Sequence, residues 1–278
     1  MRTSNSAGKL FLAIGLFVLV RPVCLRADDI EAAWKDLLIK GQRAAVAHDM
    51  ATADQFLQKA LHEAERFGST DSHVGITLAS LGPVQKALKH YAEAEASLRR
   101  ALLIIDPDDN RGTEDVADLN FDLAGILVEE GKQTAAIPVF NKCLGIFQQL
   151  GGGESLKAAA VQCAIGDTYR SLRAYADAEE PLKRCAETRE ADGGVMNVGL
   201  SDALYSLAIV YEKLGKYALA DPRYKLAEKI REKTLGIMSP AFAQVLESHA
   251  ALLKQMGRDK EAAQDAALAA AIRRHERK

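Results

Sequence analysis

Residues that commonly carry catalysis or bind metals occur in this sequence, but their spacing matches no catalytic motif. The six histidines are scattered, and His62-Glu63 lacks the second histidine that an HExxH zinc site requires. Gly151–Gly153 is not followed by the Lys-Ser/Thr pair of a phosphate-binding loop. No Gly-x-Ser-x-Gly nucleophile motif is present. The sequence therefore predicts a protein that is not an enzyme, with no cofactor, no metal site and no small-molecule substrate.

One acidic segment, Asp106–Asn110, resembles a calcium-binding loop only at its start. Its aspartates and asparagine match the first three ligand positions of such a loop. Arg111 stands where the loop needs glycine, and Ala117 stands where it needs a bidentate glutamate. We therefore interpret the segment as a turn and a helix cap.

Three of the four cysteines, Cys143, Cys163 and Cys185, lie in the main part of the chain. An odd number in an exported protein leaves at least one thiol free or pairs it with another chain. Their spacing matches no disulfide scaffold, so we expect the fold not to depend on disulfides. Cys143 and Cys185 are predicted to be small buried residues, because a free cysteine packs as a small hydrophobe. Cys163 is a candidate redox-active thiol, or a candidate for a disulfide between two chains.

The N-terminal segment has the layout of a secretory signal. Arg2 and Lys9 precede an apolar run, Leu10–Val20, and the small residue Ala27 follows it. The run is too short to span a bilayer, which needs about 20 residues. We expect residues 1–27 to be a signal peptide that is removed. A retained anchor, or lipid attachment at Cys24, is the alternative.

Removal of this segment takes away four basic and no acidic residues, so the net charge changes from −2 to −6. A mildly acidic protein has no electrostatic basis for binding nucleic acid. We expect an exported protein, periplasmic or extracellular if the source is bacterial. Membrane contact is expected only if the N-terminal segment is retained.

Small residues recur in three columns with a period of 41 or 42 residues. The first column is Ala53, Ala94, Ala136, Ala178, Ala220 and Ala262. The second column, seven residues later, is Ala60, Ala101, Cys143, Cys185, Ala227 and Ala269. The third, twelve residues before the first, is Gly41, Gly82, Ala124, Gly166, Ala208 and Ala250. Such matched small residues predict helices whose backbones approach one another closely.

Larger residues keep the same register and indicate paired helices. Four residues after the first column stand Leu57, Leu98, Phe140, Leu182, Tyr224 and Ala266. Apolar residues within each segment recur at helical spacing, as in Leu204, Leu207 and Tyr211. Gly215 is expected to end the first helix of its unit. No strand pattern is present.

Four prolines fall within the predicted helices. Pro138, Pro181 and Pro222 are expected in the first turn of a second helix, where a missing N–H costs little. Pro83 lies inside a first helix and is expected to kink or shorten it.

The fifth unit carries the fullest pattern: Leu204-x-x-Leu207-Ala208-x-x-Tyr211, then Gly215-Lys216-Tyr217-x-x-Ala220-x-Pro222. This pattern resembles tetratricopeptide repeats, and the period of about 42 residues resembles their kinesin-light-chain-type subclass. The resemblance implies an all-α fold, a right-handed superhelical α-solenoid of about six helix pairs over residues 28–278. The expected units are about 31–70, 71–112, 113–154, 155–196, 197–238 and 239–278.

The resemblance also implies a concave groove lined by the first helix of each unit. Its lining positions are Lys35, Leu38, Gln42, Ala79, Lys86, Asp118, Phe121, Glu129, Cys163, Asp167, Arg170, Asp202, Tyr205, Glu212, Lys213, Glu247, Lys254 and Gln255. A lining with both charges and two aromatic rings suits an extended peptide or a helix. The same positions also fit an ordinary solvated helix face. Kinesin-light-chain-like grooves usually carry asparagine two residues before the third column, and this chain has none there: Ile39, Ser80, Asp122, Ala164, Ser206 and Ser248.

Two functions fit these features. The first is an exported scaffold that binds a peptide or protein partner in the groove. The alternative is a membrane-anchored or lipid-attached structural or assembly protein of the cell envelope. Repeats of this kind serve many unrelated binding proteins, so the sequence does not name the partner.

Overall fold

The structure is a computed structural model that describes residues 27–109, 112–153, 155–193 and 196–276. The predicted signal peptide before Ala27, with Cys24, lies outside these residues, and so does Arg111. Within the described ranges, no helix is both long and apolar enough to cross a membrane.

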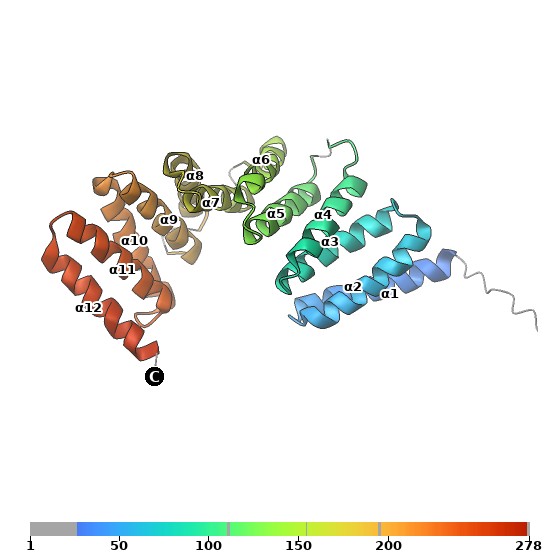
Figure 1. Cartoon of the computed structure of the whole chain (residues 1–278), viewed down its shortest axis with the longest axis horizontal. Coiled ribbons are helices and arrows are strands. Elements are labelled where there is room, and N and C mark those ends of the chain that lie inside the picture. Colours follow the sequence, from blue (N-terminus) through green and yellow to red (C-terminus); the bar gives the residue numbers. More distant parts are fainter. Residues whose placement is uncertain (1–26, 110–111, 154, 194–195, 277–278) are drawn as a thin grey trace, which may run out of the picture.

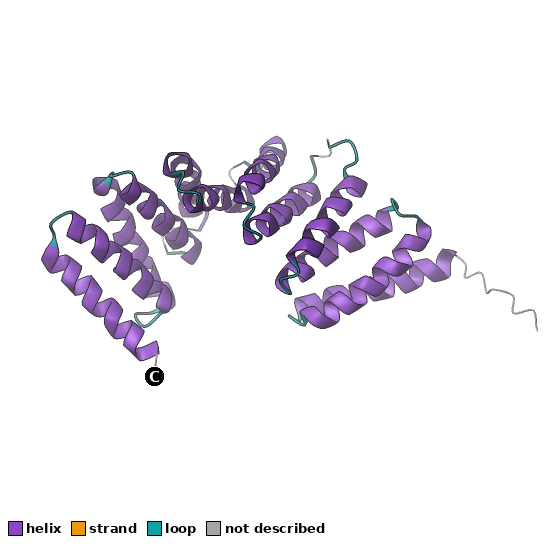
Figure 2. Ribbon diagram, viewed as in Figure 1, coloured by secondary structure: helices purple, strands orange, loops and turns teal. Residues whose placement is uncertain are grey.

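Twelve α-helices and one 3₁₀ turn form the described part of the chain, which contains no strand (Figure 2). In order they are α1 (Ala27–Val46), α2 (Met50–Ala64), η1 (Glu65–Phe67), α3 (Ser72–Ala87), α4 (Tyr91–Ile105), α5 (Glu114–Glu129), α6 (Gln133–Gln149), α7 (Leu156–Ser171), α8 (Tyr175–Gly193), α9 (Val198–Lys213), α10 (Tyr217–Leu235), α11 (Pro240–Gln255) and α12 (Asp259–Glu276). Odd-numbered helices are the first helices of six pairs, and even-numbered helices are the second. The all-α prediction is confirmed.

The starts and ends of the first helices repeat in sequence and in geometry. Asp71, Thr113, Ser155, Asn197 and Ser239 stand 42 residues apart, and each side chain accepts a hydrogen bond from a backbone N–H two or three residues later. These caps satisfy donors that a helix start leaves unpaired. The turn after each first helix contains one residue with positive φ: His48, Lys89, Gly131, Arg173, Gly215 and Gly257. Such a left-handed residue ends a helix sharply and lets the chain reverse.

The helix pairs stack along a curved path (Figure 1). Each helix packs against the next, and successive first helices also contact one another, from α1 with α3 to α9 with α11. No comparable contact joins successive second helices within the described ranges. Neighbouring elements lie closer together on the inside of a bend, so the first helices line the inner face of the curve.

The small columns are the contacts that allow this stacking. All the alanines and cysteines of the three columns are at most 4% exposed. A Cβ atom added to Gly41, Gly82 or Gly166 would lie 2.4 to 2.6 Å from the nearest side-chain carbon of Leu57, Leu98 or Leu182. Real Cβ contacts do not approach this closely, so these glycines are needed for the two helices of a pair to pack.

The expected position of three prolines is wrong. Pro138, Pro181 and Pro222 are the sixth or seventh residues of α6, α8 and α10, beyond the first turn. Each proline therefore removes the helical hydrogen bond from its own backbone nitrogen to the carbonyl four residues earlier. Those carbonyls belong to Thr134, Asp177 and Ala218, which are all exposed. Because solvent reaches these residues, water can replace the missing donors.

Pro83 was expected to kink or shorten its helix, and the shortening does not occur. The helix α3 continues through Pro83 to Ala87 and has the same 16 residues as α5, α7 and α9. Packing holds the helix together at this point, since Leu81 before Pro83 and Val84 after it are both buried.

Candidate partner-binding groove

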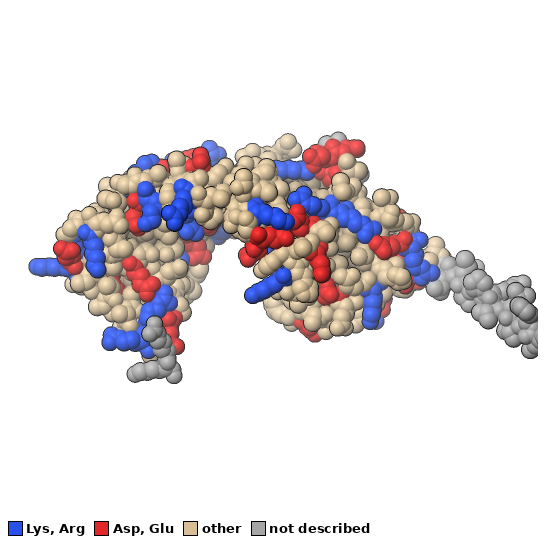
Figure 3. All heavy atoms as spheres, in the orientation of Figure 1, with Lys and Arg blue, Asp and Glu red and all other residues tan. Residues whose placement is uncertain are grey.

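The inner face formed by the first helices is the candidate functional surface. Figure 3 shows the molecule as an arch with a hollowed underside, and positive and negative side chains are interspersed over the visible face. The sequence-predicted residues lie on α1, α3, α5, α7, α9 and α11, but they are not equally available to a partner.

One hollow on this face lies between α3 and α5. It has a volume of about 340 Å³, and its lining is Ile76, Ala79, Ser80, Ile105, Asp115, Asp118, Leu119 and Asp122. Ile76 is 43% exposed, which makes it an uncovered apolar side chain on this surface. The hollow thus combines an apolar floor with three carboxylates from one helix.

The charge of this hollow is only partly neutralised. Lys157 of α7 places its Nζ atom 2.7 Å from both Glu114 and Asp118. Burial raises the pKa of the Asp122 carboxyl and Asp118 adds to this rise, whereas the ammonium of Lys86 opposes it. A partner cation placed here would gain from the remaining negative charge.

A second hollow of about 300 Å³ continues along α3. Lys86 and Glu129 line it together with Pro83, Ala87, Lys89 and Tyr91. Phe121, by contrast, is partly buried and packs against Phe140 of α6, with ring centroids 5.7 Å apart. Most of its ring area therefore stabilises the helix pair.

Serines link successive first helices at the positions where the resemblance implies asparagine. Gln42 Nε2 donates to Ser80 Oγ at 3.2 Å, and Ser206 Oγ donates to Asp167 Oδ1 at 2.8 Å. The hydroxyls of Tyr205 and Ser248 lie 3.0 Å apart. These contacts join neighbouring repeats directly, so they help to set the curvature of the groove.

On α9 the predicted residues are largely bound within the protein. Asp202 pairs with Arg231 of α10 at 2.8 Å, and the guanidinium carbon of Arg231 lies 4.9 Å from the centroid of Tyr205. Glu212 is buried and accepts a hydrogen bond from the Tyr224 hydroxyl at 3.0 Å. Lys213 is exposed, and its Nζ lies 2.9 Å from Glu212. This part of the groove therefore offers few polar side chains that lack a partner within the protein.

The remaining predicted residues lie on α1, α7 and α11. Lys35 and Lys254 are exposed, whereas Leu38 is 7% exposed and belongs to the core. Glu247 pairs with Arg273 of α12 at 2.9 Å. On α7, Arg170 donates to Asp167 at 3.1 Å.

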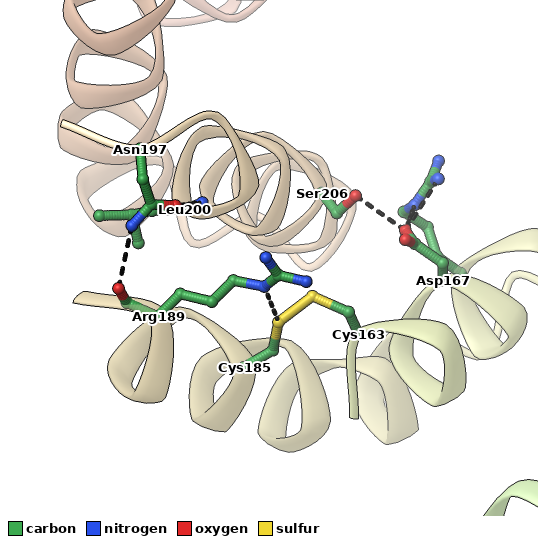
Figure 4. The surroundings of a disulfide bond; sticks show 8 residues. Cys163, Asp167, Cys185, Arg189, Asn197, Leu200 and Ser206 are labelled. Atoms are coloured by element: carbon green, nitrogen blue, oxygen red, sulfur yellow. Dashed lines mark hydrogen bonds and ion pairs between the residues drawn. A yellow bond between two sulfur atoms is a disulfide. The ribbon is translucent and has the colours of Figure 1, made fainter. Parts of the chain in front are cut away.

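The expectations for two of the cysteines are wrong. Cys163 and Cys185 form a disulfide between α7 and α8 (Figure 4), so Cys163 is neither a free thiol nor an interchain bridge. Cys185 is buried as expected, but it is cross-linked rather than a free small residue. Arg189 Nε donates to Cys185 Sγ at 3.3 Å. The disulfide thus belongs to the interior of the fourth helix pair.

Cys143 remains free and is fully buried. Burial, with a smaller effect from the nearby charge of Asp118, raises the pKa of its thiol to about 12. The thiol is therefore protonated and unreactive at neutral pH.

Sequence reasoning missed Ile76 and Asp115 as surface residues of the groove, and it considered Asp122 only as a position where asparagine is usual. The signal was present in part, because Asp115, Asp118 and Asp122 are spaced as one face of a helix. The exposure of Ile76 had no such signal, since the apolar residues two positions away on either side, Val74 and Leu78, are buried.

Comparisons with known proteins agree with this architecture. Residues 115–191 match the family model described as tetratricopeptide repeat. No curated protein matches the chain in sequence. Among solved structures, BtubC (BKLC) from P. vanneervenii superposes with a TM-score of 0.65 over 89% of this chain and 92% of that one, at 18% identity. The fold is a tetratricopeptide-type helical solenoid.

Two further solved structures show the same solenoid. The apo form of RapI has a TM-score of 0.67 at 17% identity, over 87% of this chain and 97% of that one. A putative kinesin light chain with TPR-like repeats from Podosopora anserina has a TM-score of 0.61 at 17% identity, over 71% of this chain and 93% of that one. At these identities the likeness establishes the fold alone.

Proposed function

We propose that this chain is an exported, non-catalytic scaffold that holds a peptide or protein partner against its inner face. Tetratricopeptide-type helical repeats suggest protein–protein interaction, and solenoids expose extended concave surfaces suited to it. The observation that carries the proposal is the hollow between α3 and α5, with its apolar floor and its carboxylates Asp115, Asp118 and Asp122. This chemistry fits a partner segment in which a lysine or arginine follows or precedes an apolar side chain.

Peptide selection tests the binding proposal. We expect a displayed random-peptide library, selected on the protein, to yield sequences that combine a basic and an apolar residue. Asp118→Asn with Asp122→Asn removes two carboxylates from the hollow and is expected to weaken a labelled synthetic peptide about tenfold or more, equivalent to about 1.4 kcal/mol. Fluorescence anisotropy measures the change in Kd.

The matched control removes the same charge from the outer face. Glu187→Gln with Glu190→Gln, at two exposed positions of α8, is expected to leave the Kd unchanged. Equal weakening by both pairs would show that net charge alone drives binding. Equal affinity in all three proteins would exclude the α3–α5 hollow as the binding site.

Export remains part of the proposal and rests on two observations. One is the N-terminal layout of charge, apolar run and small residue. The other is the Cys163–Cys185 disulfide, a bond that persists mainly in oxidising compartments outside the cytosol. The cell-envelope assembly protein is the alternative, in which the N-terminal segment is retained or Cys24 is lipidated.

Mass spectrometry of the mature N-terminus separates these two forms. We expect the protein recovered from its native source to begin near Asp28, because Ala27 ends the signal-like segment. A protein that still contains Met1, or one that begins at a lipid-modified Cys24, would contradict cleavage and favour the anchored form.

A further inference from the structure

A buried histidine between the last two repeats lies among carboxylates from two other helices. His249 of α11 has a side chain that is only 3% exposed. Its Nδ1 atom is 2.7 Å from Glu228 of α10 and 3.1 Å from Asp265 of α12. Its Nε2 atom is 3.1 Å from Asp221 of α10. Three helices thus place polar atoms around one imidazole, at a site outside the proposed groove.

The atoms on the Nδ1 side have the types and spacing of a metal site. One ligand atom from each of Glu228, His249 and Asp265 lies within 4.8 Å of the other two. Zinc binds histidine nitrogen and carboxylate oxygen at about 2.0–2.2 Å, which sets tetrahedral ligand atoms about 3.3 Å apart. The distances from Nδ1, 2.7 and 3.1 Å, need to lengthen by less than about 1 Å to admit the ion.

The balance of charge also favours a cation at this position. Asp221 is neutralised by Lys225 at 3.1 Å and by Arg258 at 2.7 Å. In the part of the chain that the structure describes, the only atom found within hydrogen-bond or ion-pair distance of the Glu228 and Asp265 carboxylates is Nδ1 of His249, and the charge of Lys225 acts on Asp265 only from farther away. That nitrogen can supply one proton at most to two carboxylates. A dication would balance both negative charges at once.

The other side of the ring has the support that a metal-binding histidine needs. A metal-bound histidine usually donates its second N–H to a carboxylate, which fixes the tautomer and turns the free nitrogen toward the ion. Asp221 is in that position, and Arg258, in the turn just before α12, donates a hydrogen bond to it. With Nε2 protonated, the Nδ1 lone pair faces Glu228 and Asp265.

We propose that Glu228, His249 and Asp265 bind a Zn²⁺ ion that joins α10, α11 and α12. One imidazole and two carboxylates suit zinc better than magnesium or calcium, which prefer oxygen ligands alone. The three side chains leave the fourth coordination position for water. The ion would fix the sixth helix pair to the fifth, so its effect is on the stability of the C-terminal end. No sequence motif predicts the site, because its residues come from three separate helices.

Metal titration of the full chain tests the proposal. After treatment with a chelator, the protein is titrated with ZnCl₂ by calorimetry and melted with and without the ion. We expect about one Zn²⁺ per chain with a Kd below about 10 µM, and a higher Tm in its presence. Co²⁺ in place of Zn²⁺ is expected to give the visible absorption of a four-coordinate site.

Variants connect the binding to these residues. His249→Gln and Asp265→Asn are each expected to weaken Zn²⁺ binding by at least tenfold. His90→Gln is the matched control, because His90 also lies beside a carboxylate, Glu93 at 3.7 Å, but in an exposed pair at the start of α4. It is expected to leave Zn²⁺ affinity unchanged.

Three results would overturn the proposal. They are the absence of stoichiometric Zn²⁺ binding to the wild type, unchanged binding in Asp265→Asn, and equal loss in His90→Gln. Any of them would leave His249 as a protonated ion-pair partner of its carboxylates. If His249→Gln does not fold, the Asp265→Asn titration and the Co²⁺ spectrum of the wild type still decide the question.

Discussion

Replacement of both Cys163 and Cys185 by alanine is expected to lower the free energy of unfolding by about 3 kcal/mol. The disulfide joins α7 and α8 across 22 residues, and a cross-link that closes a loop of this length restricts the unfolded chain by about that amount. Alanine is suitable at 185 because alanine fills four of the six places in the same column. Urea denaturation followed by circular dichroism measures the change, and reduction of the wild type is expected to reproduce it.

Cys143→Ala provides the control for this experiment. Cys143 occupies the same column in the third pair but is free, so its replacement is expected to change stability by less than about 1 kcal/mol and to leave the response to reductant intact. If reductant had no effect on the wild type, or if Cys143→Ala lost as much stability as the double variant, the disulfide would not be a significant constraint.

Gly166→Ala is expected to cost about 1–3 kcal/mol through overpacking. The added Cβ would lie 2.4 Å from Leu182 Cγ, so the two helices of the fourth pair would have to move apart. The other helix pairs indicate how an alanine at this position is accommodated without overpacking. Glycine faces leucine in pairs one, two and four, whereas alanine faces an aromatic residue in pairs three and five, as Ala124 with Phe140 and Ala208 with Tyr224.

A double-mutant cycle tests this pairing rule. Leu182→Phe combined with Gly166→Ala recreates the alanine–aromatic pair of the third repeat. We expect the double variant to be more stable than the sum of the two single effects predicts, with a coupling of about 0.5–3 kcal/mol. Strictly additive losses, measured by urea denaturation, would show that the glycine and the facing side chain do not depend on each other.

Much of the fold could be predicted because one contact is repeated six times. A small residue in each column marks a close helix approach, and its recurrence fixed both the pairing and the order of the helices. The prolines were misplaced because the column predicts where helices touch but not where each begins. Pro222 lies two residues after Ala220 yet five after Tyr217, where α10 begins.

The candidate site was less predictable because side-chain contacts depend on rotation between helices. The groove positions followed from the family resemblance applied to the register. Neither showed that Arg231 would bind Asp202 or that Tyr224 would bind Glu212. The disulfide had a usable signal in the register. The positions of Cys163 and Cys185 face each other in the fourth pair, and at the equivalent positions of the third pair Cys143 lies near the backbone of Phe121.

The inner face as the binding surface is tested most directly by photo-cross-linking. A library-selected peptide carrying a photoreactive side chain is bound to the protein and irradiated, and mass spectrometry locates the linked residues. We expect cross-links on α3 and α5, at or beside Ile76, Lys86 and Asp118. Cross-links confined to the second helices, such as α4, α6 and α8, would show that the inner face is not the binding surface.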